Sequence, residues 1–170
     1  DVVGLAISER MTSQVRGMEQ AKRNAQDGIS LAQTAEGSLG VVTDMLQRMR
    51  ELSVQADNGT NSASDLTTIK NEMDALVSEI DHIAGASNFN GIGLLDGSAT
   101  TVSVHISDAS DDTIDISLTD ATSSTLGVDA LDVTTDAQAA ITAIDGALDT
   151  VNSARADLGS VQNRLDFITQ

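Results

Sequence analysis

The chain has 170 residues and a formal net charge of −17, with no Cys, Pro, Trp or Tyr and only two Phe. The missing cysteines exclude a disulfide framework, a thiolate metal site and a cysteine nucleophile. The negative charge argues against a nucleic-acid partner, because phosphate binding needs clustered Lys and Arg. With so few aromatic side chains, the core must be built from Ala, Leu, Ile, Val and Met, which favours closely packed helices over a ligand pocket.

The length fits a single domain, which we assign to residues 1–170. No apolar run is long enough for a transmembrane helix. The first residues lack the basic and apolar regions of a secretory signal peptide. Because the chain begins without Met and stops inside a predicted helix, we interpret it as a piece excised from a longer chain.

The first predicted element is a long helix over residues 1–57, which carries six basic and eight acidic side chains. Its apolar seam positions span 42 residues in twelve steps, a mean step of 3.5: Ile7, Met11, Val15, Met18, Ala21, Ala25, Ile29, Ala32, Ala35, Leu39, Val42, Leu46 and Met49. This is the period of a left-handed coiled-coil seam. A helix of this length extends about 80 Å at 1.5 Å per residue, so we expect partner helices to cover its whole stripe.

Glycines interrupt this helix at Gly17, Gly28, Gly37 and Gly40. Each costs about 1 kcal/mol relative to Ala in a helix. We expect them where neighbouring elements press closely on the helix.

A second helix is predicted over residues 64–84, after the turn-forming run DNGTNSAS. Asn58-Gly59 is expected to cap the end of the first helix, and Ser62 or Ser64 the start of the second. Apolar residues then recur every three or four positions to Ile83. The short loop predicts an antiparallel helical hairpin.

Residues 87–133 form a turn, a β-hairpin region and a connector, and they hold eight acidic residues and no basic ones. Two alternating runs, centred on Val104 and Ile116, predict two half-buried strands. The acidic loop between them lacks the spacing and the terminal Glu of an EF-hand, so we favour a turn over a calcium site. The connector, residues 119–133, is expected to have some β character.

The last predicted element is a helix over residues 134–170, whose seam again repeats near 3.5 residues. Thr134 and Asp136 suit its positive N-terminal end. The predicted fold class is mainly α with a small β region. It is an elongated antiparallel three-helix, coiled-coil-like bundle plus a β-hairpin.

Enzyme function is disfavoured, and no cofactor or metal is expected. The two histidines, His82 and His105, fall on different predicted elements, an exposed helix face and the polar side of a strand. No HExxH pair, nucleophile elbow, P-loop or dinucleotide-binding glycine pattern is present.

Several segments together resemble the core of bacterial flagellins. They are GLAISERMTSQVRG at 4–17, RNAQDGISLAQTAEGSL at 23–39, LQRMRELSVQADNGTNSASD at 46–65, SNFNGIGLLDG at 87–97 and RADLGSVQNRLDFI at 155–168. The resemblance covers nearly the whole chain. It implies an extracellular structural subunit that stacks with other flagellin subunits into the flagellar filament. It also implies an export chaperone that binds through a terminus missing here, and an isolated piece that is monomeric.

The resemblance further implies recognition by the flagellin-sensing Toll-like receptor of vertebrates. The matching residues are Gln47, Arg48 and Leu52 of the QRMREL motif, together with Glu72. An Arg beside an exposed Leu, with a carboxylate from the adjoining helix, would form a compact binding patch. The alternative is that Arg48 and Glu72 are surface charges that join the two helices, which on sequence physics alone is the stronger interpretation.

Other polar residues and other functions stay open. The polar residues of the last helix, Arg155, Asp157, Asn163 and Arg164, could contact the bundle, another subunit or only solvent. The closest rival function is the hook–filament junction protein, which shares this core. A rod-shaped adhesin is a further alternative, although it lacks the aromatic side chains that stack on sugars.

Overall fold

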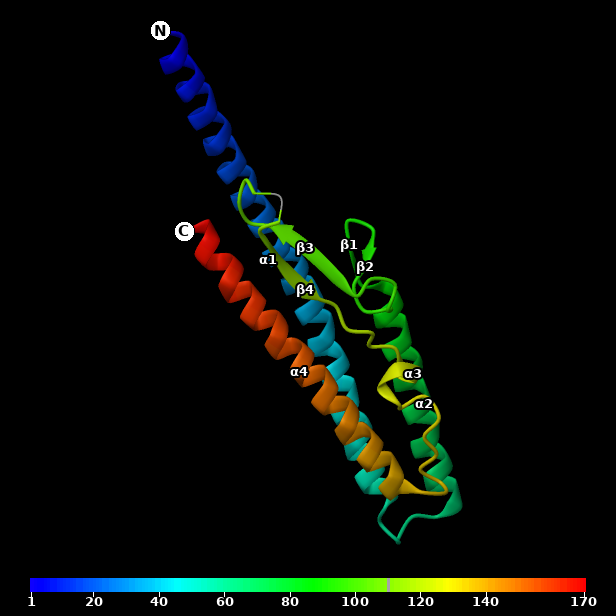
Figure 1. The fold of residues 1–170 in the computed structure, drawn as a ribbon. Helices are drawn as coiled ribbons and strands as arrows, with labels where there is room; N and C mark the ends of the chain where they lie inside the picture. Colours follow the sequence, from blue (N-terminus) through cyan, green and yellow to red (C-terminus); the bar gives the residue numbers. More distant parts are fainter. Residues whose placement is uncertain (110) are drawn as a thin grey trace.

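The molecule is an elongated rod whose two chain ends lie towards the same end (Figure 1). The structure is a computed structural model that describes residues 1–109 and 111–170. Its elements in chain order are α1 (Val2–Ala56), α2 (Ala63–Ala86), β1 (Asn88–Phe89), β2 (Ile92–Gly93), β3 (Thr101–His105), β4 (Thr113–Ser117), α3 (Ser123–Leu126) and α4 (Ala137–Thr169). The predicted fold class, a helical bundle with a small β region, is confirmed.

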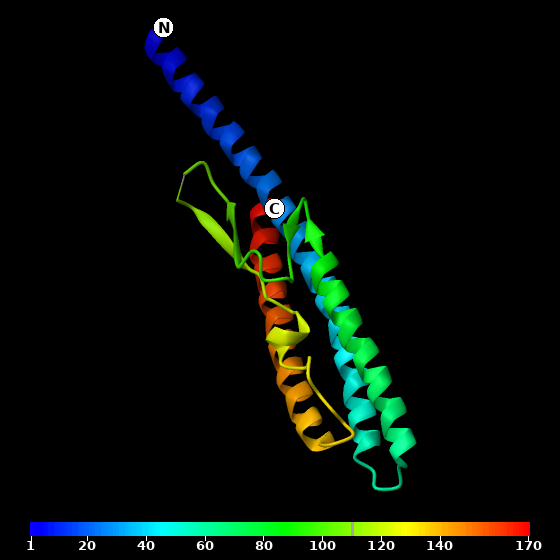
Figure 2. The ribbon, with the colours of Figure 1, turned by 90° about the vertical axis from the view of Figure 1, so that its right-hand side faces the viewer.

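The long helix α1 is the spine of the rod. It runs antiparallel to α4, its most extensive contact, and antiparallel to α2 (Figures 1 and 2). Its apolar face is buried in these contacts from Ala21 to Ala56, with Val42, Leu46 and Met49 fully covered. Burial of one such large side chain contributes about 1.5–3 kcal/mol, so packing holds this part of α1 in place.

The turn between α1 and α2 is closed by a side chain that the sequence analysis did not identify. Asn58-Gly59 was expected to cap the end of α1, but the C-cap is Asp57 and Gly59 does not take the positive φ typical of a glycine cap. Instead, Asn61 Nδ2 donates hydrogen bonds to the carbonyl oxygens of Gln55 and Asn58, both at 2.7 Å. The Asn61 side-chain amide thus satisfies carbonyl groups left open at the end of the helix, so no left-handed glycine is needed to cap them.

The start of α2 is fixed by a reciprocal pair of hydrogen bonds. Asp65 N–H donates to Ser62 Oγ at 3.0 Å, and Ser62 N–H donates to Asp65 Oδ2 at 3.0 Å. This capping box satisfies two of the free N–H groups at the helix start. The Ser62 backbone N–H, and after it the Ser62 hydroxyl, lower the pKa of Asp65 because both hydrogen bonds favour the carboxylate.

The β3–β4 hairpin lies across α1 at two glycines. Val102 pairs with Ile116, and Val104 with Ile114, so the apolar side chains share one face as the alternation predicts. A Cβ at Gly28 would lie 3.0 Å from both Val104 Cγ2 and Leu165 Cδ1, and a Cβ at Gly17 only 2.8 Å from Asp108 Cβ. Eleven residues are three helical turns, so Gly17 and Gly28 share a face. These glycines let the hairpin approach the α1 backbone.

The connector differs from its prediction. Residues 119–133 contain the short helix α3 and no strand, so the expected β character is wrong. Asp81 of α2 accepts hydrogen bonds from the backbone N–H and the hydroxyl of Ser123, both at 2.8 Å. Buried Leu126, Val128 and Val133 hold the rest of the connector on the bundle. Local hydrogen bonding by Ser and Thr, which competes with strand pairing, explains the difference.

Candidate functional site

Two surfaces of the rod carry features that a partner could recognise. The first is the N-terminal third of α1, which projects past the other elements (Figure 1). The second is the polar face shared by α1 and α2 near Arg48.

The projecting part of α1 exposes the continuation of the buried seam. We call Val3, Ile7, Met11, Val15 and Met18 the open stripe, and each is at least half exposed, from 50% to 66%. Partner helices were expected to cover the stripe of this helix, but the described elements of this chain leave this part of it exposed. The stripe is exposed because the opposing helix α4 ends beside the β3–β4 hairpin and does not extend along this part of α1 (Figure 2).

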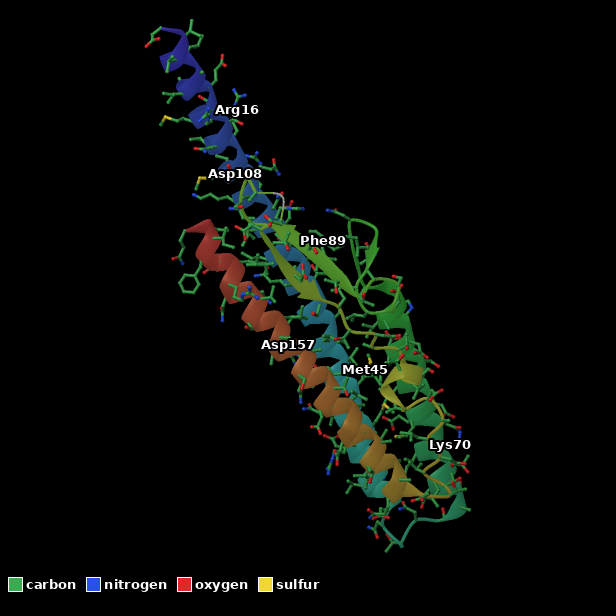
Figure 3. All side chains as sticks on the ribbon, viewed as in Figure 1. Arg16, Met45, Lys70, Phe89, Asp108 and Asp157 are labelled. Atoms are coloured by element: carbon green, nitrogen blue, oxygen red, sulfur yellow. The ribbon has the colours of Figure 1, made fainter. Side chains whose placement is uncertain are left out.

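A groove adjoins the lower end of the open stripe. It has a volume of about 450 Å³ and lies between α1, the tip of the β3–β4 hairpin and the last turn of α4. Val15, Met18, Ile106 and Ile168 supply its apolar lining. Asp108 at the hairpin tip lies against α1 at Gly17, close to Arg16 (Figure 3). The open stripe therefore runs into a concave apolar end.

The second surface brings together two of the four residues predicted as a receptor site, Arg48 and Glu72, and a third, Gln47, is exposed next to Arg48 in the chain. Arg48 Nη2 lies 2.9 Å and Nε 3.2 Å from Glu72 Oε1, and Nη1 lies 3.3 Å from Glu51 Oε2. The hydrogen bond to Glu72 is the main cause that raises the pKa of Arg48. Gln47 is exposed beside this cluster. We call Gln47, Arg48, Glu51 and Glu72 the polar cluster.

Leu52 does not belong to the exposed surface. An exposed Leu was expected beside Arg48, but this expectation is wrong, because Leu52 is only 2% exposed and belongs to the core. Arg48 and Leu52 do lie one turn apart, yet the helix directs Leu52 inward with Met49. Glu51, which the sequence analysis did not single out, lies beside Arg48 in its place and is identifiable from its i, i+3 spacing.

The polar residues of α4 divide into two groups. Arg155 pairs with Glu36 of α1, with Nη2 2.7 Å and Nε 2.9 Å from Glu36 Oε1, and its guanidinium lies against Gly40. Asp157, Asn163 and Arg164 are exposed. Contact with the bundle, with another subunit or only with solvent had been left open for these residues. Arg155 makes the first of these, a contact across the bundle.

Catalytic and metal chemistry find no support in the described residues. His82 is exposed on α2 and His105 is exposed on β3. Across residues 1–109 and 111–170, no group of three or more His, Cys, Asp or Glu is placed to hold a metal ion. Part of the acidic loop considered for calcium, at Ser110, lies outside the described residues. None of the described helices combines the length and apolar character that crossing a membrane requires.

The fold and these surfaces define a class of protein: a thin helical rod that exposes part of its own packing seam. Residues 1–100 match the model of the bacterial flagellin N-terminal helical region. A flagellin of Halalkalibacterium halodurans is 46% identical over 98% of this chain and 62% of its own length. The flagellin FlaB2 of Treponema pallidum is 42% identical over 98% of this chain and 64% of its own length. The chain belongs to the bacterial flagellin family.

Solved structures agree with this assignment. The crystal structure of Bacillus cereus flagellin superposes with a TM-score of 0.78 at 40% identity and covers 87% of each chain. A structure assigned to a flagellar hook-associated protein of Vibrio parahaemolyticus has a TM-score of 0.76 at 18% identity, over 98% of this chain and 88% of that one. At that identity only the fold is shared. The chain spans less than two thirds of the length of these two flagellins.

Proposed function

We propose that this chain is the rod-forming core of a structural subunit of the bacterial flagellar filament, outside the cell, where it packs against other flagellin subunits and catalyses no reaction. The observation that carries the proposal is the open stripe. The seam that holds α1 on α4 continues through Val3, Ile7, Met11, Val15 and Met18 with no partner in the described chain. An exposed apolar stripe of this length is typical of a surface that is covered in an assembly.

The relatives support the same role. Besides the flagellins above, a flagellar filament 33 kDa core protein of Treponema phagedenis is 42% identical over 98% of this chain and 65% of its own length. These sequence relatives are flagellins and a filament core protein, whereas the hook-associated neighbour shares the fold alone. We therefore favour the filament subunit over the hook–filament junction protein.

Immunogold labelling of cells of the source organism tests this choice. Antibody raised against this chain should label the filament along its whole length. Label confined to the filament base would instead establish the junction protein. A strain that lacks the gene provides the control, and flagella that stay unlabelled in the parent strain would overturn the proposal.

Isolated residues 1–170 are expected to be monomeric, as the sequence analysis proposed. The open stripe works against this expectation, because apolar faces of two copies could pair. Sedimentation of the purified chain should give one elongated species at low concentration. Stable fibres at modest concentration would contradict the prediction.

We also propose that the polar cluster contacts the flagellin-sensing Toll-like receptor of a vertebrate host. Arg48 is held by carboxylates on two sides, so its guanidinium is oriented before a partner arrives, which lowers the entropy cost of binding. Leu52 contributes from the core side, where it supports the helical turn that carries Arg48. The rod-shaped adhesin stays an alternative, for which a glycan-binding screen is the discriminating experiment.

Arg50 provides a matched control for a test of this site. Arg48 and Glu72 have side-chain exposures of 48% and 47%, and Arg50 and Asp145 have 46% and 48%. Both pairs join α1 to another helix, but they lie on different sides of α1. Arg48→Ala is expected to weaken receptor binding about tenfold or more, while Arg50→Ala leaves it unchanged. Both variants should melt within a few degrees of the parent, since exposed ion pairs add little stability. Equal receptor binding by both variants would contradict the assignment of the polar cluster as the receptor site.

A further inference from the structure

The loop between α1 and α2 contains an Asn-Gly pair in a conformation suited to a spontaneous chemical change. In Asn-Gly sequences the glycine backbone nitrogen can attack the asparagine side-chain carbonyl carbon, because no side chain on glycine blocks the approach. The chain contains two such pairs, Asn58-Gly59 and Asn90-Gly91. The structure holds them in different ways, which gives them different expected reactivity.

Asn58 already has its side chain folded back over the following backbone. Its Oδ1 accepts a hydrogen bond from the Thr60 backbone N–H at 3.2 Å, which places the side-chain carbonyl over the Gly59 peptide. This N–H points at the oxygen that becomes negatively charged when the carbonyl carbon is attacked. A donor already aimed at developing charge lowers a barrier in the same way as an oxyanion hole.

The attacking nitrogen is also free. Within the described part of the chain, the Gly59 N–H has no hydrogen-bond acceptor, and nothing lies within 4 Å of the position that a Gly59 Cβ would occupy. Asn58 and Gly59 are both exposed, so water can take the proton and later open the ring. Nucleophile, electrophile and stabilising donor thus lie within three consecutive residues, which makes the reaction intramolecular and favourable in entropy.

We propose that Asn58 is a site of spontaneous deamidation in the folded protein. Gly59 N bonds to Asn58 Cγ and loses its proton to water, and the side-chain nitrogen leaves as ammonia, which gives a cyclic succinimide. Water then adds to either carbonyl and opens the ring, which leaves Asp or isoaspartate at position 58. The net change is one water consumed and one ammonia released, with no oxidant or cofactor.

Asn90 is the internal comparison. It lies in the two-residue turn of the β1–β2 hairpin, with φ of 51° at Asn90 and 81° at Gly91, and the flanking Phe89 and Ile92 are paired. Ring closure requires rotation of the Asn90 backbone away from this turn, which breaks the strand pairing that fixes it. We therefore expect slower deamidation at Asn90, although the two pairs have the same sequence chemistry.

Asn61, which precedes Ser62, is half-buried and is protected from the same reaction for a different reason. Its side-chain amide donates to the Gln55 and Asn58 carbonyls at 2.7 Å. The Ser62 N–H that would attack it is engaged by Asp65 Oδ2 at 3.0 Å. The capping box of α2 thus shields Asn61, three residues from the reactive position.

The change matters at this place in the fold. An added carboxylate at position 58 would follow Asp57 at the C-terminal end of α1, where the helix dipole disfavours negative charge. An isoaspartate would also lengthen the backbone by one carbon and displace the carbonyl that Asn61 holds. The loop therefore loses part of its closure as the protein ages.

The test incubates the purified chain at mildly alkaline pH and 37 °C and measures deamidation at each asparagine by peptide mass spectrometry. The native chain should deamidate at Asn58 about tenfold faster than at Asn90. The same incubation in concentrated denaturant should bring the two rates together, because only the fold distinguishes the two pairs. Equal native rates, or a difference that persists in denaturant, would overturn the proposal.

Two variants separate the role of the Thr60 N–H from that of its side chain. Thr60→Pro removes the donor and should slow deamidation at Asn58 towards the Asn90 rate. Thr60→Ala keeps the backbone N–H and should leave the rate unchanged. A rate in Thr60→Pro equal to that of the parent would contradict the stabilising role assigned to this N–H.

Discussion

Two parts of α1 have the same apolar period, but the apolar side chains of one part are buried and those of the other are exposed. From Ala21 to Ala56 the seam of α1 is buried, whereas the open stripe from Val3 to Met18 is at least half exposed. Side-chain type does not explain this, because Met49 is fully buried and Met11 is 60% exposed. The difference comes from the neighbours, since α2 and α4 cover the second part, whereas only the hairpin tip and the last turn of α4 reach the lower end of the first. The seam period therefore identifies the face of a helix that can pack against another helix. The rest of the fold decides which part of that face is buried.

The largest expected effect is a contrast between the two parts on core truncation. Leu46→Ala removes a fully buried side chain from the covered part and should lower the free energy of unfolding by about 2–5 kcal/mol. Met11→Ala changes an exposed side chain of the open stripe and should change it by no more than about 0.5 kcal/mol. Urea unfolding of both variants measures the contrast. A substantial loss in Met11→Ala would show that the open stripe is covered in solution.

The next effect is smaller and has opposite signs at two glycines of α1. Gly28→Ala places a methyl group 3.0 Å from Leu165 Cδ1 and Val104 Cγ2. We expect a loss of about 1 kcal/mol, because overpacking outweighs the gain in helix propensity. Gly37→Ala meets nothing within 4 Å and should gain about 0.5–1 kcal/mol. Thermal unfolding distinguishes the two. Stabilisation by both variants would show that the hairpin does not press on α1.

The smallest effect is a loss of folding stability at acid pH, which arises from carboxylates outside the projecting part of α1. Hydrogen bonds to the carboxylate lower the pKa of Asp65, and those of Asp96, Asp120 and Asp132 are lowered by neighbouring Ser and Thr donors. A lowered folded pKa contributes stability that is fully present above the ordinary Asp value of about 3.9. That stability is lost as the pH falls through the folded pKa values.

Ser62→Ala tests the Asp65 share of this acid response. It removes one donor to Asp65 and the cap of α2, so it should cost about 1 kcal/mol at neutral pH. It should also flatten the pH dependence below about pH 4. Unfolding curves collected from neutral to acid pH measure both. An unchanged acid slope in this variant would place the response elsewhere.

The sequence predicted those features that depend on local period and composition. The 3.5-residue seam identified the long helices, and alternation around Val104 and Ile116 placed the strands on the correct face. What it missed depends on neighbours distant in the chain. The exposure of Ile7 through Met18 follows from where α4 ends. The burial of Leu52 is different, because Leu52 is one seam step of three residues beyond Met49 and the period itself could have placed it in the core. The cap by Asn61 was missed because a glycine two residues earlier gave a more familiar signal.

The candidate site shows the same division. Arg48 and Glu72 belong to different helices, and only the resemblance to flagellins linked them before the structure placed them 2.9 Å apart. Glu51 was within reach of a local rule, since it lies three residues from Arg48 on α1. No local rule could have separated Asn58-Gly59 from Asn90-Gly91, because the distinction is conformational.

The N-terminus lies at one pole of the rod and the α1–α2 loop lies at the other (Figure 1). With α1 counting 55 residues, a label at Asp1 and a label in the loop are about 80 Å apart at 1.5 Å per residue. A single cysteine introduced at each pole of this cysteine-free chain would therefore act as a molecular ruler. It would report the bending of the rod without disturbing either the open stripe or the polar cluster.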